Sequence, residues 1–237
     1  FLPIQPNRKL NKKSTKLNKD RIIRSILRKE RDFIIVNKPV GLACHGGSGI
    51  SLGLIETIRQ LDKRYSDAQL VHRIDKDTSG CLVIALKKSI LREFHREIRN
   101  KHVDKIYTAV VKGKWPKDLQ KITLNLKKET LKSGKRVVKT NEKGKESETE
   151  FKLLSSGQSN SLIRAKIITG RTHQIRVHSS HKGYPILGDI KYGDTAYNKQ
   201  LQSKGLKRML LHAESINFKN LDIRQIAPVP DVFSKYV

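Results

Sequence analysis

The sequence predicts an α+β protein with a mixed, largely antiparallel β-sheet core and flanking helices. Three observations support this fold class. Short apolar runs of strand length are numerous, segments with helical apolar spacing are few, and strands do not alternate regularly with helices. The chain shows no internal repeat, and its 237 residues are enough for one large domain with its own core.

The first predicted strands and helices start near residue 32. The run "FIIVNKP" is a short strand that a proline ends, and the glycine-rich loop "GLACHGGSG" follows it. Ser51 opens a predicted helix, in which apolar residues recur at helical spacing from Leu54 to Leu61. The runs "AQLVH" and "CLVIAL" are then strands, with a loop between them, and residues 88–100 are a helix.

The second part of the chain is predicted to be mostly strands. The run "KIYTAVV" is followed by strands near 121–126, 147–154 and 161–168, with a Gly/Lys-rich hairpin region near 133–146. The segment "GRTHQIRVHSSHKG" is predicted to be a helix that Gly183 closes. The runs "MLLHAESINF" and "IRQIAP" supply two more strands. The predicted globular domain therefore covers residues 32–237.

Residues 1–31 are predicted to be a basic linker or arm. The stretch "NRKLNKKSTKLNKDR" is rich in Lys and Asn and has no periodic apolar face. A solvated tail and an arm that touches RNA both fit this composition.

The charge balance points to a polyanionic partner. The chain has 50 Lys plus Arg against 22 Asp plus Glu, a formal net charge of +28, and such a field attracts polyanions. Nucleic acid is the first candidate and an anionic membrane the second, but no apolar run approaches the roughly 18 to 20 residues of a membrane span. Cys44 and Cys81 lack metal-ligand spacing and are expected to be reduced thiols in a cytoplasmic protein.

The stretch "HRIDKDTSG" (72–80) is the strongest candidate for a catalytic loop. Asp75 follows an arginine and precedes a turn between two predicted strands, where a carboxylate could serve as a nucleophile or a base. The alternative is that Asp75 and Asp77 cap the turn with their side chains. The Asp-Thr-Ser-Gly sequence also resembles the Asp-Thr-Gly of aspartic proteases, but that chemistry needs a second, paired Asp.

Two other motifs have competing interpretations. The loop "HGGSG" (45–49) could cradle phosphate or form an oxyanion loop, but no Walker pattern is present and Ile50 breaks the nucleophile-elbow pattern around Ser48, which favours a flexible rim loop. In "GRTHQIRVH" (170–178) the histidine spacing is not a recognised metal pattern, so no metal is predicted. Arg171 and Arg176 fit phosphate binding or pairing with a carboxylate, and a solvated charged helix is the alternative.

Taken together, these motifs resemble those of the RluA-type pseudouridine synthases. The segments "KPVGLACHGGSG", "HRIDKDTSG", "KIYTAVV", "GRTHQIRVH", "GYPILGDIKYGD" and "LLHA" occur in the order and spacing of that family, from about residue 32 to the C-terminus. The "HGGSG" loop, the "LKSGKRVVKTNEKGKESETEF" segment and the "RMLLHA" ending are most similar to members that modify large-subunit ribosomal RNA. One departure is Ile74, where the family usually has Leu.

The resemblance implies the pseudouridine synthase catalytic fold and a set of site residues. Asp75 is implied to be the catalytic aspartate, Arg176 its partner, and Tyr107 the tyrosine that stacks on the target uracil. Arg73 is implied to fill the space that the flipped nucleotide leaves. The remaining implied substrate-binding residues are His72, Arg171, His173 and Gln174.

The implied function is the conversion of specific uridines of large-subunit (23S) ribosomal RNA to pseudouridine, with no cofactor and no metal. The expected protein is a cytoplasmic monomer, and the basic lead-in is expected to be the remnant of a linker after an S4-like domain. The alternative is a catalytically inactive RNA-binding or ribosome-assembly module of the same fold. Changing Asp75 to Asn discriminates between these two functions.

Overall fold

The computed structural model of the chain describes residues 19–47, 52–131, 134 and 136–237. In these ranges eleven strands form one sheet, in the order β1-β2-β4-β10-β5-β9-β8-β6-β7, with β11 beside β10 and β3 beside β4. Among the strand pairings of the described residues, only β4 with β10 is parallel. The predicted mixed, largely antiparallel α+β fold is therefore confirmed.

The strands are β1 (Ile26–Lys29), β2 (Phe33–Lys38), β3 (Gln69–Leu70), β4 (Ser79–Ala85), β5 (Val103–Lys112), β6 (Lys121–Thr130), β7 (Arg136–Thr140), β8 (Lys145–Ser156), β9 (Asn160–Ile167), β10 (Leu211–Phe218) and β11 (Ile223–Ile226). The α-helices with named bounds are α2 (Leu54–Arg59), α3 (Lys88–Arg99), α4 (Gln174–His181) and α5 (Thr195–Ser203). None of the helices in the described ranges is both long and apolar enough to cross a bilayer.

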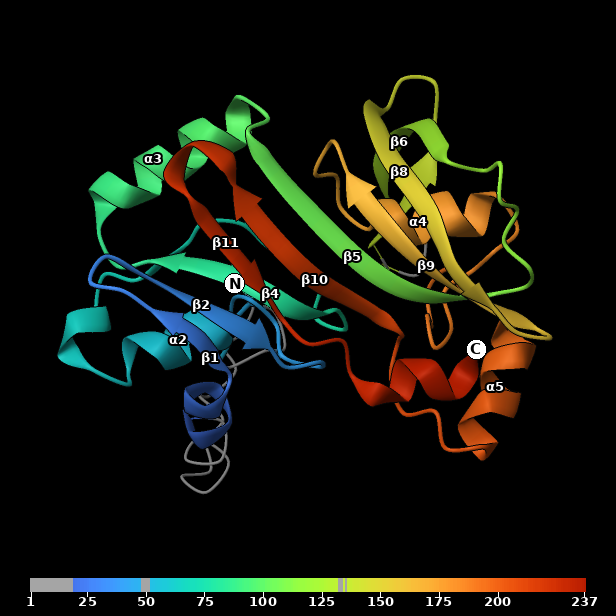
Figure 1. Cartoon of the computed structure of the whole chain (residues 1–237), viewed down its shortest axis with the longest axis horizontal. Coiled ribbons are helices and arrows are strands. Elements are labelled where there is room, and N and C mark those ends of the chain that lie inside the picture. Colours follow the sequence, from blue (N-terminus) through green and yellow to red (C-terminus); the bar gives the residue numbers. More distant parts are fainter. Residues whose placement is uncertain (1–18, 48–51, 132–133, 135) are drawn as a thin grey trace, which may run out of the picture.

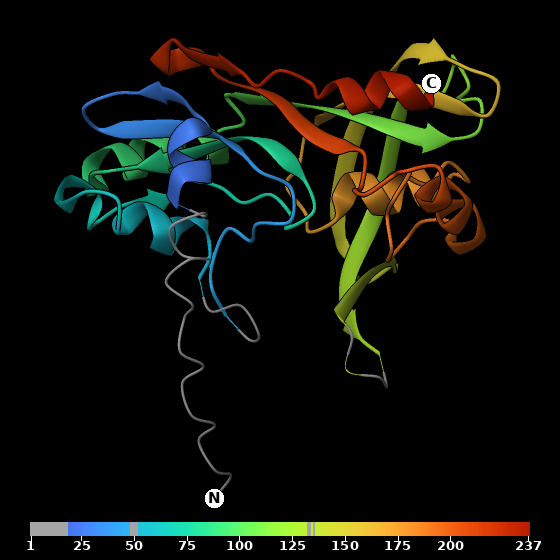
Figure 2. The same cartoon turned by 90° about the horizontal axis from the view of Figure 1, so that it is seen from below.

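Two halves of the molecule meet at the central strands β10 and β5 (Figure 1). One half contains β1, β2, β3 and β4 with α2 and α3, and the other contains β6, β7, β8 and β9 with α4 and α5. Figure 2 shows β10 and β5 running along one side of the molecule and joining the halves. Segments far apart in the sequence therefore have to come together near these strands to form a shared site.

The start of β4 is fixed by a close backbone approach at Gly80. Its φ of +114° lies in the region that favours glycine, and a Cβ there would stand 2.2 Å from the carbonyl oxygen of Ala213 in β10. Gly80 pairs with Ala213 in the parallel β4–β10 register. Only glycine allows this contact, which sets the position of the loop that precedes β4.

The core lies on both faces of the sheet. The larger cluster runs beneath both halves and includes Val36, Leu82, Tyr107 and Ile163. On the opposite face Phe94 of α3 packs against Phe218 of β10, with ring centroids 4.6 Å apart. Strand β4 is buried at every position because both of its faces are covered, which explains the continuous apolar run in its sequence.

The packed body extends upstream of residue 32, where the globular domain was predicted to start. Ile22, in the helical residues 19–24, is fully buried in the larger core cluster, and β1 pairs antiparallel with β2. The polar, Lys-rich composition of this segment concealed one buried apolar residue and a short edge strand. The rest of the predicted arm, residues 1–18, lies outside the described residues.

One helix differs from its predicted extent, and one helix was not predicted. Helix α4 begins at Gln174, not at residue 170, because His173 has a left-handed backbone (φ 55°) that cannot continue a helix. The predicted end is confirmed, since Gly183 follows the helix with φ +85°. Helix α5 was not predicted, and the predicted start of α2 at Ser51 lies outside the described residues.

Candidate active site

The loop between β3 and β4 holds Asp75 by its backbone and leaves the side chain available. The Thr78 N–H donates to the Asp75 carbonyl oxygen (3.1 Å), which forms the turn. The thiol of Cys44 donates to the carbonyl oxygen of Ile74 (3.2 Å). Within the described residues the Asp75 carboxylate accepts hydrogen bonds from Arg176 alone, so its side chain does not cap the turn, which was the alternative interpretation.

Buried Lys38 ties this loop to the segment that follows β2. Its ammonium group donates to the carbonyl oxygens of Pro39 (2.9 Å), Leu42 (2.8 Å) and Lys76 (3.0 Å). The Gly41 N–H donates to the same Lys76 carbonyl (2.9 Å). Three carbonyl acceptors satisfy all three N–H groups of a charged lysine, and they fix the backbone one residue after Asp75.

Arg176 reaches Asp75 from the other half of the molecule. The residue lies in the first turns of α4 with 5% of its side chain exposed, and Nη1 donates to Asp75 Oδ2 at 2.9 Å. Its remaining donors form a fork on Asp189, with Nε to Oδ2 and Nη2 to Oδ1, both at 2.8 Å. The guanidinium carbon also lies 5.1 Å from the centre of the Tyr192 ring. Arg176 therefore has a single orientation, in which one N–H edge faces Asp75.

Asp189 is the fixed end of this ion pair. Its side chain has no exposed surface, and besides Arg176 it accepts hydrogen bonds from the backbone N–H groups of Lys191 (2.8 Å) and Tyr192 (3.1 Å). Burial alone would raise the pKa of Asp189. The hydrogen bonds from Arg176 and the two backbone N–H groups have the larger combined effect, so the pKa lies below its usual value. The carboxylate stays ionised and the guanidinium stays in place.

His173 approaches the second oxygen of Asp75. Its Nε2 lies 3.8 Å from Asp75 Oδ1, and its Nδ1 is 2.7 Å from the hydroxyl of Tyr192. That hydroxyl oxygen also accepts the backbone N–H of Val138 in β7 (2.9 Å). Burial lowers the pKa of His173, and the charge of Asp75 raises it by less. The net lowering of the pKa favours the neutral ring. The left-handed backbone at His173 is the conformation that turns the ring toward the carboxylate.

Tyr107 lies in β5 on the face of the sheet that carries the larger core cluster. It is 8% exposed, and burial raises the pKa of its phenol strongly, with the charge of Asp75 as the next cause. The phenol is therefore protonated at neutral pH and close enough to Asp75 to feel its charge. Asp75 and Arg176 come from segments far apart in the sequence and meet at 2.9 Å, and Tyr107 lies on the face of the sheet that carries the larger core cluster.

A family model described as RNA pseudouridylate synthase matches residues 32–181, which is more than half of the chain. The chain belongs to the RNA pseudouridylate synthase family. The family that the sequence motifs resembled is thereby confirmed.

Curated relatives in this family have a consistent name. The chain is 47% identical over 208 residues to ribosomal large subunit pseudouridine synthase C of Haemophilus ducreyi, covering 87% of this chain and 65% of the relative. It is 43% identical over 195 residues to the protein of that name in Escherichia coli, covering 81% and 61%. The chain thus spans about two thirds of the length of these relatives.

Solved structures of the pseudouridylate synthase family share the fold. Human RNA pseudouridylate synthase domain containing 4 superposes with a TM-score of 0.76 at 26% identity, over 94% of this chain and 95% of that one. Human RNA pseudouridylate synthase domain containing 1 gives 0.70 at 27% identity, over 86% and 82%. The predicted pseudouridine synthase fold is therefore confirmed.

The other predicted site residues of this family member occupy two kinds of position. Arg73 is exposed beside Asp75, and Arg171 is exposed, with Nε donating to the Glu146 carbonyl at 3.0 Å. His72 faces the protein instead, because its Nε2 accepts the backbone N–H of Val83 (3.2 Å). Burial lowers the pKa of His72 to about 3, so the ring is neutral.

Gln174 is 3% exposed and uses its whole amide within the protein. Its oxygen accepts from the Thr169 hydroxyl (2.8 Å) and the Arg171 N–H (2.9 Å). Its nitrogen donates to the Glu148 carbonyl and the Thr149 hydroxyl. The structure leaves this amide no free donor or acceptor for a substrate, and its contacts fix the loop that carries Arg171.

Sequence reasoning missed Asp189 and Tyr192, which the structure places around Arg176. A signal was present, because both lie in the quoted segment "GYPILGDIKYGD", where Asp189 is an isolated acid inside an apolar run. An isolated acid in such a run indicates either a turn or a buried ion pair. Within the described ranges, no three His, Cys, Asp or Glu side chains converge as metal ligands do.

Proposed function

We propose that this chain isomerises specific uridines of large-subunit ribosomal RNA to pseudouridine. The observation that carries the proposal is the ion pair of Asp75 with buried Arg176, which Asp189 holds through two further hydrogen bonds. Asp75 and Arg176 both lie within the residues that the family model matches. The names of the relatives, which specify the large ribosomal subunit, support the choice of RNA.

The reaction breaks the bond between C1′ and N1 of the uridine and joins C1′ to C5. The electron pair of the broken bond stays on the uracil, C5 loses a proton and N1 gains one, so nothing is oxidised. The Asp75 carboxylate either attacks C1′ or removes the C2′ proton, and both routes need it ionised. Arg176 serves both routes, because its fixed Nη1 donor, 2.9 Å from Oδ2, orients the Asp75 carboxylate.

Tyr107 is proposed to stack on the target uracil. Its raised pKa means that the phenol enters the reaction protonated, which supports a stacking role over that of a base in the free protein. A uridine within folded RNA must first be flipped out of its stack, at a cost of a few kcal/mol. Arg73, which is exposed two residues before Asp75, is proposed to occupy the vacated space. Arg171 is proposed to contact RNA phosphate from the rim of the site.

The proposed setting is the cytoplasm, with the protein acting as a monomer and without a cofactor. Free, buried thiols at Cys44 and Cys81 support a reducing compartment. The isomerisation transfers no electrons, and therefore the proposed chemistry requires no redox group.

Substitution Asp75→Asn tests this function directly. We expect pseudouridine formation in transcribed large-subunit RNA to fall by at least about 10³-fold, the scale for losing a nucleophile or general base. RNA affinity should change little, because the amide has the same shape. The measurement is pseudouridine content by chemical mapping, together with RNA binding. A wild-type protein that binds this RNA and never modifies it would instead be an inactive binding module.

A further inference from the structure

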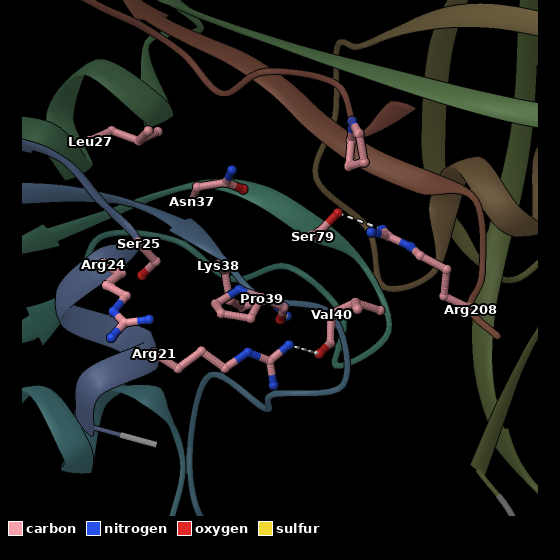
Figure 3. Close-up of a pocket in the computed structure, with 11 residues that line it drawn as sticks. Arg21, Arg24, Ser25, Leu27, Asn37, Lys38, Pro39, Val40, Ser79 and Arg208 are labelled. Atoms are coloured by element: carbon pink, nitrogen blue, oxygen red, sulfur yellow. Dashed lines mark hydrogen bonds between the residues drawn. The ribbon is translucent and has the colours of Figure 1, made fainter. Parts of the chain in front are cut away.

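A cationic cavity of about 370 Å³ lies beside the Asp75 loop and takes no part in the proposed mechanism. Figure 3 shows Arg21 and Arg24 on one side, from the helical residues 19–24, and Arg208 on the other, with Asn37 and Ser79 between them. Three guanidinium groups thus surround one space. No carboxylate from the described residues lines this cavity.

Arg208 is held in the cavity wall by a buried hydrogen-bond chain. His212 is fully buried, and its Nε2 faces the Ala227 carbonyl (3.2 Å), so Nε2 carries the proton and Nδ1 accepts from the Ser79 hydroxyl (2.8 Å). The Ser79 oxygen can then accept from Arg208 Nη2 (2.5 Å). Arg208 Nε donates to the Met209 carbonyl (3.1 Å). The guanidinium is therefore positioned by the fold like a residue of a binding site.

Within the described ranges, no carboxylate neutralises the positive charge of this cavity. Neither Arg21, Arg24 nor Arg208 forms an ion pair within the described ranges. Arg21 donates to a backbone oxygen, the Val40 carbonyl at 3.2 Å. Arg208 is partly buried without a carboxylate partner in the described residues, so an anion that enters the cavity would form charge-assisted hydrogen bonds with its guanidinium group.

A second cavity shows that cations near a hollow are not enough. It measures about 480 Å³ and is lined by Lys121, Arg164, Lys166 and other residues. Each of these three cations has its own carboxylate, since they pair with Glu148 (2.9 Å), Glu214 (2.8 Å) and Asp104 (3.1 Å), respectively. Three of the four cations that line that cavity are paired with carboxylates, whereas none of the three arginines at the cavity of Arg208 is paired within the described residues.

The cationic cavity shares a wall with the Asp75 loop. Lys38, Pro39 and Val40 line the cavity, and the Lys38 ammonium donates to the Lys76 carbonyl next to Asp75. The cavity is therefore linked to the Asp75 loop through Lys38.

We propose that this cavity binds a phosphate group of the RNA backbone, outside the uridine site. The guanidinium groups form charge-assisted hydrogen bonds to the phosphate oxygens, for which their planar donor geometry is suited. The site anchors RNA without reading its sequence. This inference rests on the proposed function for its choice of RNA over a free phosphate.

The test uses the double variant Arg21→Ala/Arg24→Ala, whose side chains are both exposed. The control is Arg99→Ala/Arg224→Ala, which removes the same charge at two exposed positions away from the cavity. We expect the cavity variant to bind transcribed large-subunit RNA about tenfold more weakly. The slope of the logarithm of the binding constant against the logarithm of salt concentration should be smaller in magnitude by about one. The control should change affinity less than threefold.

Substitution Arg208→Met provides an independent check from the opposite wall. Its RNA affinity should fall in the same way. Equal losses for the cavity and control variants would overturn the proposal, since only general charge would then matter. A second outcome would also overturn the proposal, in favour of a free phosphate. In that outcome millimolar inorganic phosphate stabilises the wild type and not the cavity variant, and the two proteins bind RNA equally well. A wild type without synthase activity would refute the proposed function and leave the affinity comparison valid.

Discussion

Arg176 and Arg208 are two guanidinium groups that the fold removes from bulk water, and their surroundings differ. Arg176 contacts two carboxylates, Asp75 and Asp189, through three hydrogen bonds of 2.8 to 2.9 Å. Arg208 donates to a hydroxyl and to backbone carbonyls, and no carboxylate in the described residues pairs with it. Burial lowers the pKa of Arg208, whereas the acids around Arg176 raise its pKa in spite of burial.

The difference teaches what each arginine can do. A guanidinium that is already neutralised cannot gain much from another anion, but it can hold a carboxylate in one orientation. A guanidinium held by neutral acceptors keeps its charge for a ligand. The protein uses the first arrangement at the proposed catalytic carboxylate and the second beside it.

Removing the charge of Arg176 is expected to have the largest effect on folding. Substitution Arg176→Met leaves Asp189 buried without a counterion, and breaking a buried pair in this way costs about 3–5 kcal/mol. The free energy of unfolding, measured by urea denaturation, should fall by that amount. Pseudouridine formation should be lost as well, because Asp75 loses its partner.

A double variant separates these two consequences. Arg176→Met/Asp189→Leu removes both buried charges, and replacing a buried ion pair by apolar groups is often close to neutral for stability. We expect stability to recover only in part, because the backbone N–H groups of Lys191 and Tyr192 lose their acceptor, while activity stays lost. Recovery of activity together with stability would show that Arg176 acts only as a structural residue.

The sequence allowed the strands around the site to be predicted better than the contacts within it. Apolar runs such as those of β2 and β4 indicate strands because both faces of the central sheet are covered. Asp75 and Arg176 were predicted as partners from family motifs, and they meet at 2.9 Å. Asp189 and the left-handed His173 were not predicted, because burial and backbone conformation depend on tertiary packing between segments. Arg208 was overlooked for the same reason.

The groups that hold the two arginines should lose their contributions to stability in different pH ranges. Burial lowers the pKa of His212, which holds Arg208 through Ser79, to about 4 from 6.5. The unfolded state therefore binds this proton before the folded state does, and stability is lost as the pH falls from about 6.5 to about 4. Asp189 has a lowered pKa, so its contribution is kept until the pH falls below the usual Asp value of about 3.9.

The measurement is the slope of unfolding free energy against pH between 6.5 and 5. Other buried histidines contribute to this slope in the wild type, since the pKa of His178 is also lowered to about 4. Substitution His212→Gln should reduce the mean slope over this range by about 1 kcal/mol per pH unit, whatever its constant cost to stability. Between pH 7 and 8 the two proteins should have equal slopes. An unchanged slope below pH 6.5 would mean that His212 is charged in the folded protein.

Removing the charge of Arg208 is expected to have the smallest effect on folding. Substitution Arg208→Met leaves no carboxylate unpaired, and the Ser79 hydroxyl can still donate to His212. The cost should be that of ordinary hydrogen bonds, about 1 kcal/mol, by urea denaturation in the buffer used for Arg176→Met. Because both substitutions replace Arg by Met, the difference between their costs in unfolding free energy measures the penalty of leaving the Asp189 carboxylate without a counterion. A cost for Arg208→Met as large as that for Arg176→Met would show that a counterion for Arg208 exists within the chain, and the charge of the cavity would then already be neutralised.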